Sequence, residues 1–250
     1  MSVVAVPLLR SSLHVTTRLL VTVRDPTTRA YRPVGFLGRV QDRYRFAYLR
    51  REVERDDFRP LPGLGRAREA PSWSDTLFPL FAERVISARR PDRQVSLDAL
   101  GLPLDAAPME VLARSHGQRV GDTVELLPAP EAGPGEDVAF TFLTHGVRYL
   151  MEAERDRITS LVRGQRLRLR LDSDNETNPQ AQLVTDAGDV RLGWVPDPLI
   201  DVINDIDERR LSVERSNGPQ VGFHFRLLVR LEGRVSRDTR LFDGPAWETV

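Results

Sequence analysis

One stretch near the middle of the chain limits how large any single folded unit can be. Residues 128–137 read Pro-Ala-Pro-Glu-Ala-Gly-Pro-Gly-Glu-Asp, without a periodic apolar pattern. Proline and glycine interrupt helices and strands, so this composition is typical of a linker. We therefore predict two small domains, residues 1–130 and 138–250, joined by a linker over residues 131–137.

Apolar residues on both sides of this stretch come mostly in short runs that end at turn formers. These runs predict strands over residues 19–23, 34–38, 44–48, 122–128, 138–144, 166–171, 181–185 and 190–195 and one final strand. Helical spacing predicts helices over residues 75–90, 105–117 and 153–163 and one capped by Asp197. The fold class we expect is α+β and β-rich, with a second domain built as an OB- or SH3-like barrel with flanking helices.

Composition excludes several classes of protein. The net charge is zero, which argues against a bulk cationic nucleic-acid binder, so any such site is local. The 250 residues include no cysteine, which rules out a disulfide framework and a thiolate metal site. All 36 basic residues are arginine, which clamps phosphate bidentately, although a GC-rich genome explains the same bias. We expect a cytoplasmic protein without a membrane-spanning segment.

Four motifs of the second half resemble the HIRAN domain. They are His-Gly-Val-Arg-Tyr at 145–149, Asp-Ser-Asp-Asn at 172–175, Gln-Ala at 180–181 and Gly-Trp-Val-Pro at 193–196. HIRAN domains are small β-barrels, best known from helicases that act at stalled replication forks, where they grip the 3′ end of single-stranded DNA. The resemblance implies that Arg148 and Tyr149 contact a terminal nucleotide.

The loop 172–181 departs from the family pattern in part. Asn175 matches it, whereas Thr177 and Asn178 stand where the family has a tyrosine and an aspartate that engage the DNA end. Asn178 can still hydrogen-bond a hydroxyl, because its amide both donates and accepts, but Thr177 cannot stack on a base. Trp194 can stack on a base or pack at the barrel rim, and both alternatives remain open.

Three further arginines alternate with leucines over residues 166–171. On a strand, Arg166, Arg168 and Arg170 share one face at a spacing of ~6 to 7 Å, close to the phosphate spacing of an extended single strand. Such a row can form a backbone track for DNA. It is equally the ordinary outward face of a half-buried strand.

The first half resembles the N-terminal subdomain of HipA-type toxin kinases over residues 17–130. The motifs are Leu-Phe-Pro-Leu-Phe at 77–81, Leu-Gly-Leu at 100–102, Pro-Met-Glu-Val-Leu-Ala at 108–113 and the segment 120–128. In that family the subdomain helps to hold partner proteins. We expect no kinase body beside this subdomain, because the sequence has no ATP-binding lysine and no catalytic aspartate set.

No catalytic or cofactor motif accompanies these resemblances. The four histidines have no metal-ligand spacing, and we expect no metal and no cofactor. Acidic residues at 172, 174 and 176 leave a metal-dependent nuclease as a minor alternative. The leading hypothesis is a non-catalytic adaptor for DNA repair or defence that binds single-stranded DNA or DNA 3′ ends and a protein partner, such as a helicase or nuclease. The alternative is a protein-interaction module that regulates a HipA-like kinase or another toxin partner without binding DNA.

Overall fold

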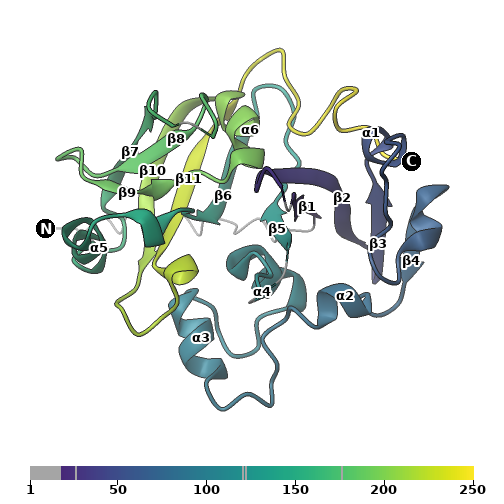
Figure 1. Cartoon of the computed structure of the whole chain (residues 1–250), viewed down its shortest axis with the longest axis horizontal. Coiled ribbons are helices and arrows are strands. Elements are labelled where there is room, and N and C mark those ends of the chain that lie inside the picture. The colour runs from purple at the N-terminus through teal and green to yellow at the C-terminus, as the bar shows by residue number, and fades with distance from the viewer. Residues whose placement is uncertain (1–17, 26, 120, 122, 176) are drawn as a thin grey trace, which may run out of the picture.

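The computed structural model describes residues 18–250 except 26, 120, 122 and 176. Two antiparallel sheets dominate it, one from each half of the chain (Figure 1). The first sheet runs, in spatial order, β4 (Ser72–Ser74), β3 (Arg43–Tyr48), β2 (Tyr31–Val40), β1 (Arg18–Arg24) and β5 (Val124–Pro128). The second runs β6 (Asp137–Leu143), β11 (Leu227–Val235), β10 (Ile206–Ser216), β7 (Arg166–Leu171), β8 (Gln182–Thr185) and β9 (Arg191–Trp194).

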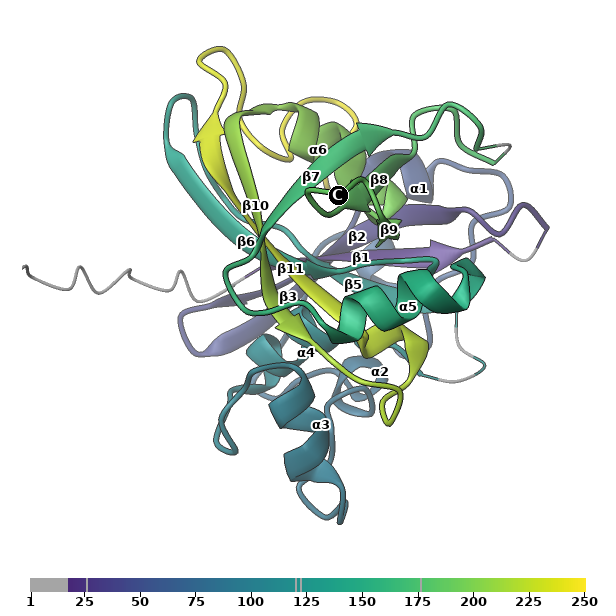
Figure 2. The same cartoon turned by 90° about the vertical axis from the view of Figure 1, so that its left-hand side faces the viewer.

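The second sheet curls until its two outer strands meet, and Figure 2 views the molecule from this side. His145, just beyond β6, forms an isolated antiparallel bridge with Trp194 at the end of β9. The backbone N–H groups of the two residues each donate to the other's carbonyl, at 2.8 and 3.0 Å. The predicted α+β, β-rich fold class is confirmed.

The helices are short and lie at the edges of the sheets. They are α1 (Arg50–Val53), α2 (Pro79–Ala82), α3 (Arg93–Ala99), α4 (Pro108–Ser115), α5 (Glu152–Thr159) and α6 (Ile200–Asn204). Single 3₁₀ turns add η1 (Gly65–Arg68), η2 (Val147–Tyr149), η3 (Asp197–Leu199) and η4 (Phe223–Phe225). Proline opens α2 and α4, where its missing N–H costs no hydrogen bond.

Some sequence predictions are wrong in detail. Asp197, expected to cap the last helix, is instead the first residue of η3, whose N-cap is Pro196. The helix expected over residues 75–90 stops at Ala82, because the chain then turns and delivers Val85 and Ile86 to a small apolar cluster under α3. The single strand expected at the end of the second half is two strands, β10 and β11, which pair along most of their length.

The largest core cluster contains residues from both sheets. Leu20, Phe36 and Leu127 of the first sheet pack in it with residues such as Phe142 and Val229 of the second. The segment 131–137 contributes to the same cluster through a buried alanine, Ala132. One core therefore runs across the segment predicted as a linker, and the division into two domains stays a prediction.

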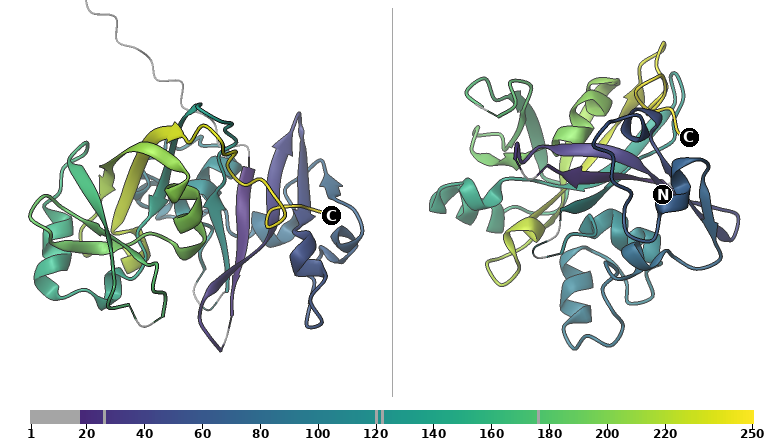
Figure 3. Two further views of the ribbon diagram at one scale, coloured as in Figure 1. Left: turned by 90° about the horizontal axis from the view of Figure 1, so that it is seen from above. Right: turned by 45° about the vertical axis from the view of Figure 1, so that its right-hand side comes forward.

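The segment after β11 returns to the first sheet, as the yellow trace in Figure 3 shows. Thr249 bridges Leu49 at the end of β3, and the N–H of Arg50 donates to the carbonyl of Glu248 at 2.8 Å. Trp247 packs on Phe36 with their ring centroids 6.0 Å apart. Among the described residues, none of the helices has the length and apolarity needed to cross a bilayer.

Candidate functional site

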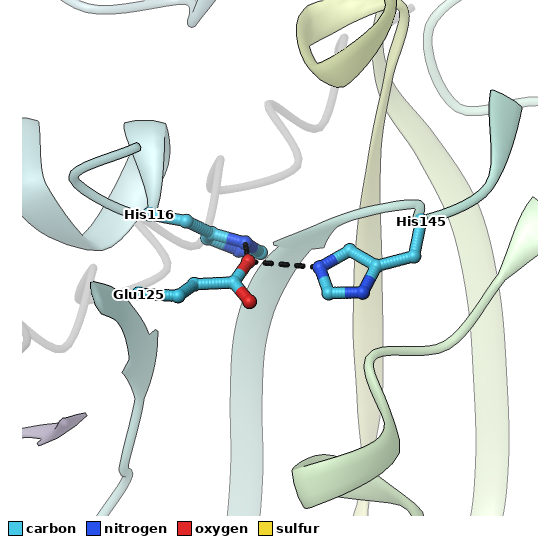
Figure 4. Close-up of side chains that lie close together, drawn as sticks. All are labelled: His116, Glu125 and His145. Carbon is cyan, nitrogen blue, oxygen red and sulfur yellow. Dashed lines mark hydrogen bonds and ion pairs between the residues drawn. The ribbon is translucent and has the colours of Figure 1, made fainter. Parts of the chain in front are cut away.

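A carboxylate without exposure to solvent lies between the two sheets. Strand alternation on β5 turns Val124 and Leu126 toward the core of the first half, and Glu125 and Leu127 toward the second half. Glu125 is 0% exposed. Its Oε1 lies 2.9 Å from Nδ1 of His116 and 2.8 Å from Nε2 of His145 (Figure 4). We call these three residues the buried triad.

The hydrogen bonds fix the proton of His116. Its Nε2 accepts from the backbone N–H of Leu143 at 3.1 Å, so this nitrogen carries no proton. The proton therefore resides on Nδ1 and is donated to Glu125, which leaves the ring neutral. Burial lowers the pKa of His116, consistent with a neutral ring. The amide Nε2 of Gln118 supplies a further donor to Oε1, at 2.9 Å.

His145 is the charged partner of Glu125. Burial opposes its charge, but the charge of Glu125, the hydrogen bond between them and the charge of Asp197 together raise the pKa of His145. Burial likewise opposes ionisation of Glu125, yet the two histidines hold its pKa well below the usual range. The side chain of His145 is 21% exposed, and its second ring nitrogen points away from Glu125 (Figure 4).

His145 forms part of the wall of a cleft of about 430 Å³. This volume lies within the range of small-ligand pockets, about 300–1,000 Å³. The cleft draws on both halves of the chain: the β1–β2 hairpin, η2, η3 and η4 all line it. Its basic side chains besides histidine are Arg24, Arg29 and Arg148, and its aromatic side chains besides histidine are Tyr31, Tyr149 and Phe223.

The three arginines of the cleft have no carboxylate partner among the described residues. Arg24 donates from Nε to the carbonyl of Arg29 at 3.1 Å, and its guanidinium carbon lies 5.8 Å from the centre of the Tyr31 ring. The guanidinium of Arg148 lies 4.6 Å from the centre of the Tyr149 ring and donates to its hydroxyl. Elsewhere among the described residues, arginines such as Arg32, Arg157 and Arg191 pair with buried carboxylates, so the cleft is a local concentration of unpaired positive charge.

The predicted site residues lie in four places: the cleft wall, the loop 172–181, the rim of the curled sheet and the outer face of β7. Arg148 and Tyr149 form part of the cleft wall, and Tyr149 is 66% exposed. Asn178 reaches the same cleft indirectly, because its amide nitrogen donates to Asp197 Oδ1 at 2.9 Å. Asn175 holds the loop instead of facing the cleft. Its Oδ1 accepts from the backbone N–H groups of Thr177 and Asn178 at 3.1 and 3.0 Å. Thr177 is exposed.

Trp194 packs at the rim of the curled sheet. Its Nε1 donates to Asp172 Oδ2 at 2.7 Å, and its ring rests on Gly146. Gly146 has φ +73°, and a Cβ added there would lie 2.4 Å from the Trp194 ring, so only glycine fits. Stacking of this tryptophan on a base stays a prediction.

The row of arginines on β7 lies apart from the cleft. Arg166, Arg168 and Arg170 are exposed and Leu167 is buried, so the three arginines share the outer face of the strand. Arg168 lies 3.8 Å from Asp189, and none of the three lines the cleft. The structure therefore gathers Arg148, Tyr149 and, through Asp197, Asn178, and leaves the β7 row on a separate surface.

Sequence reasoning missed the buried triad. Its histidines show no ligand spacing, because the triad forms only when the two sheets face each other. The one available signal is Glu125 itself, an acid inside the apolar run Val124 to Leu127. Such a position requires a polar partner from elsewhere in the fold.

The triad has the residue types of a metal site. One ligand atom from each residue lies within 4.8 Å of the others. The hydrogen bonds do not fit a metal, however. Nδ1 of His116 holds the proton, and Oε1 of Glu125 already faces three donors. Binding a metal would leave the N–H of Leu143 facing a protonated Nε2, so the arrangement favours a proton-sharing network.

The comparisons with known proteins give no family. No family model matches the chain, and no curated protein matches it. Among solved structures, a crystal structure of a protein from Lactobacillus plantarum, determined by a structural genomics consortium, is similar with a TM-score of 0.30 and 20% sequence identity. The match covers 40% of this chain and 99% of that one. A likeness of this size carries no argument about function.

Proposed function

We propose that the protein is a non-catalytic adaptor that binds single-stranded DNA, including its 3′ ends, in the cleft between the sheets. The observation that carries this proposal is the meeting of three arginines without carboxylate partners and three aromatic rings in one small cleft. Arginine binds phosphate with charge-assisted hydrogen bonds. An aromatic ring stacks on any base, worth about 1–3 kcal/mol per base. The arginines of the cleft can thus bind the phosphate of a nucleotide, and its aromatic rings can stack on the base.

The resemblance to the HIRAN domain agrees with this choice of ligand. The motif at 145–149, which carries the resemblance, supplies five consecutive residues to the cleft wall. Under this proposal the curled second sheet is the OB- or SH3-like barrel of that family. Tyr149 stacks on the terminal base and Arg148 binds its phosphate. Asn178 orients Asp197, and the β7 arginines contact the strand farther from its end.

The second part of the proposal concerns a protein partner in the cytoplasm. The first half, which resembles the HipA N-terminal subdomain, would dock a helicase or nuclease. In the alternative function it would restrain a HipA-like kinase, and the cleft would bind no DNA. Co-purification with candidate partners separates these functions once DNA binding has been measured.

DNA binding is tested by fluorescence anisotropy with labelled single strands whose 3′ ends are free or blocked, at low salt. We expect binding by the wild type and a loss of about tenfold in affinity for Arg148→Ala, since a hydrogen bond to a charged group is worth about 1.5–3 kcal/mol. Tyr149→Ala should lose a similar factor. Arg66→Ala, in η1, is the matched control because Arg66 is exposed and does not line the cleft. A wild type that binds no strand at low salt refutes the DNA-binding function.

A further inference from the structure

We propose that the cleft binds a terminal phosphate monoester at His145. This inference rests on the proposed DNA-binding function of the cleft and specifies its ligand. The imidazolium of His145, held on the buried carboxylate of Glu125, donates one hydrogen bond to this phosphate, and the arginines of the cleft wall provide the others. The ligand class is a phosphate-terminated strand end or a mononucleotide, which share this group.

The first argument is the position of the His145 donor. Nε2 of His145 must donate to Glu125, because an ionised carboxylate only accepts hydrogen bonds. In the charged ring the second nitrogen also carries a proton, and this nitrogen points away from Glu125 (Figure 4). Since His145 also lines the cleft, one edge of its ring contacts the buried carboxylate of Glu125 and the rest of the ring is available to a ligand in the cleft.

The second argument is the balance of charge. The cleft wall carries three arginines and one acid, Asp197, while His145 and Glu125 compensate each other. An excess of two positive charges remains. A phosphate monoester carries about −1.5 to −2 charges near pH 7 and three acceptor oxygens, whereas a phosphodiester within a strand carries one charge. The monoester therefore matches the cleft better.

The third argument is the presence of buried polar atoms without a partner at this place. The hydroxyl of Thr144, which lines the cleft and is 2% exposed, has no hydrogen-bond partner among the described residues. The second carboxylate oxygen of Glu125 has none either. A buried polar group without a partner costs about 1–3 kcal/mol, and a bound oxyanion or its ordered water can remove that cost at Thr144.

The site depends on pH through the groups that face His145. They are Glu125 from β5, His116 after α4, Asp197 from η3, Arg24 from β1, Tyr31 from β2 and Arg148 from η2. Deprotonation of His145 removes its donor and leaves the charge of Glu125 without its counter-ion. Affinity therefore falls as pH rises through the raised pKa of His145. The ligand itself loses charge below about pH 6, so affinity is greatest between these two limits.

The experiment compares one labelled strand with a 3′-hydroxyl, a 3′-phosphate or a 5′-phosphate, and unlabelled dAMP as competitor, at pH 6.5 and pH 9. We expect about tenfold tighter binding of one phosphate-terminated strand than of the hydroxyl strand at pH 6.5, and loss of this preference at pH 9 or in His145→Gln. Arg66→Ala is the control and should keep this preference, because Arg66 is exposed and does not line the cleft.

A second measurement avoids any folding defect of the variants. The ring carbons of His145 in the wild type are followed by NMR across pH with and without inorganic phosphate, and phosphate should raise the pKa of His145. Equal binding of all strand ends, with His145 unmoved by phosphate, overturns the phosphate site and leaves the DNA-binding function standing. If no strand binds but dAMP or phosphate raises the pKa of His145, the phosphate site stands and the DNA-binding function falls.

Discussion

Nε2 of His145 and Oε1 of Glu125 lie 2.8 Å apart, although Glu125 belongs to the first sheet and His145 follows β6 of the second. The pair joins the second half to the first by a charge interaction at the centre of the molecule. It also makes the charge of the cleft depend on a residue of the first half.

Glu125→Gln should strongly destabilise the protein. The substitution leaves the charge of His145 buried without its counter-ion, and breaking a buried ion pair in this way costs about 3–5 kcal/mol. Urea unfolding followed by circular dichroism measures the change. Glu131→Gln is the control, because the side chain of Glu131 is 63% exposed and its ion pair with Arg18 should contribute less than about 1 kcal/mol. Equal effects of the two substitutions would contradict the role of Glu125.

The stability that His145 contributes should disappear at high pH. Its pKa in the folded state is raised above the value of 6.5 for an unperturbed histidine, so its contribution is fully present below pH 6.5 and is lost as pH rises through the raised pKa. The difference in unfolding free energy between wild type and His145→Gln should therefore shrink from pH 6 to pH 9. A difference that stays constant over this range would argue against the ion pair.

The opposite sign is expected for His116. Burial lowers its pKa, so the unfolded state binds the proton more readily, and the contribution of the neutral ring is lost as pH falls below about 6.5. In wild type the opposite pH dependences that the two histidines give to the unfolding free energy partly cancel between pH 6 and 7. The His145→Gln variant should for this reason lose stability on acidification sooner than wild type, as unfolding curves at pH 5 to 7 would show.

Gly146→Ala should disturb the rim of the cleft. The new methyl group would overlap the ring of Trp194, and the backbone would keep a left-handed conformation at φ +73°. Overpacking costs about 1–3 kcal/mol and the positive φ adds to it. Gly164→Ala tests the backbone term alone, since Gly164 has φ +81° and nothing within 4 Å of the added atom. Gly146→Ala should therefore lower the unfolding temperature more than Gly164→Ala does, because only the first methyl group overlaps the Trp194 ring. Equal unfolding temperatures would mean that the Trp194 ring shifts without cost.

The β7 arginines should contribute to DNA binding in a different way from Arg148. If they contact phosphates along the strand, replacing Arg166, Arg168 and Arg170 by alanine reduces the slope of log affinity against log salt by about two, because each contact contributes ~0.7 on a single strand. Preference for a strand end should stay unchanged. Anisotropy titrations from 50 to 300 mM salt measure this slope. An unchanged slope would mean that the three arginines do not contact DNA and only form the solvated face of the strand.

Local sequence patterns predicted most of the strands, since the alternation that defines a strand is contained within it. In β7 the three arginines are exposed and Leu167 is buried, as the pattern predicted, but Leu169 is only half-buried and Leu171 is exposed at the end of the strand. The helix expected over 75–90 could not be bounded, because Val85 and Ile86 fit a helical spacing as well as they fit the cluster under α3. Propensity alone does not decide between local and tertiary partners.

The candidate site was predicted only in part, for a physical reason. Arg148 and Tyr149 belong to one short motif and could be found in it. Glu125 meets His145 from twenty residues away and His116 from nine, with no strand or helix periodicity connecting them. Their meeting depends on how the two sheets face each other, which is set by the apolar core and not by the spacing of the triad.

The return of Thr249 to Leu49 has a consequence for the order of assembly. During synthesis, β3 leaves the ribosome long before the segment that pairs with its end and before Trp247, which covers Phe36. Until that segment is synthesised, one side of the Phe36 ring is not packed against Trp247. The end of β3 also lacks its bridge to Thr249. Cleavage that removes this segment should therefore first disturb Tyr48, whose carbonyl accepts from the N–H of Val250 at 3.1 Å, and the core around Phe36.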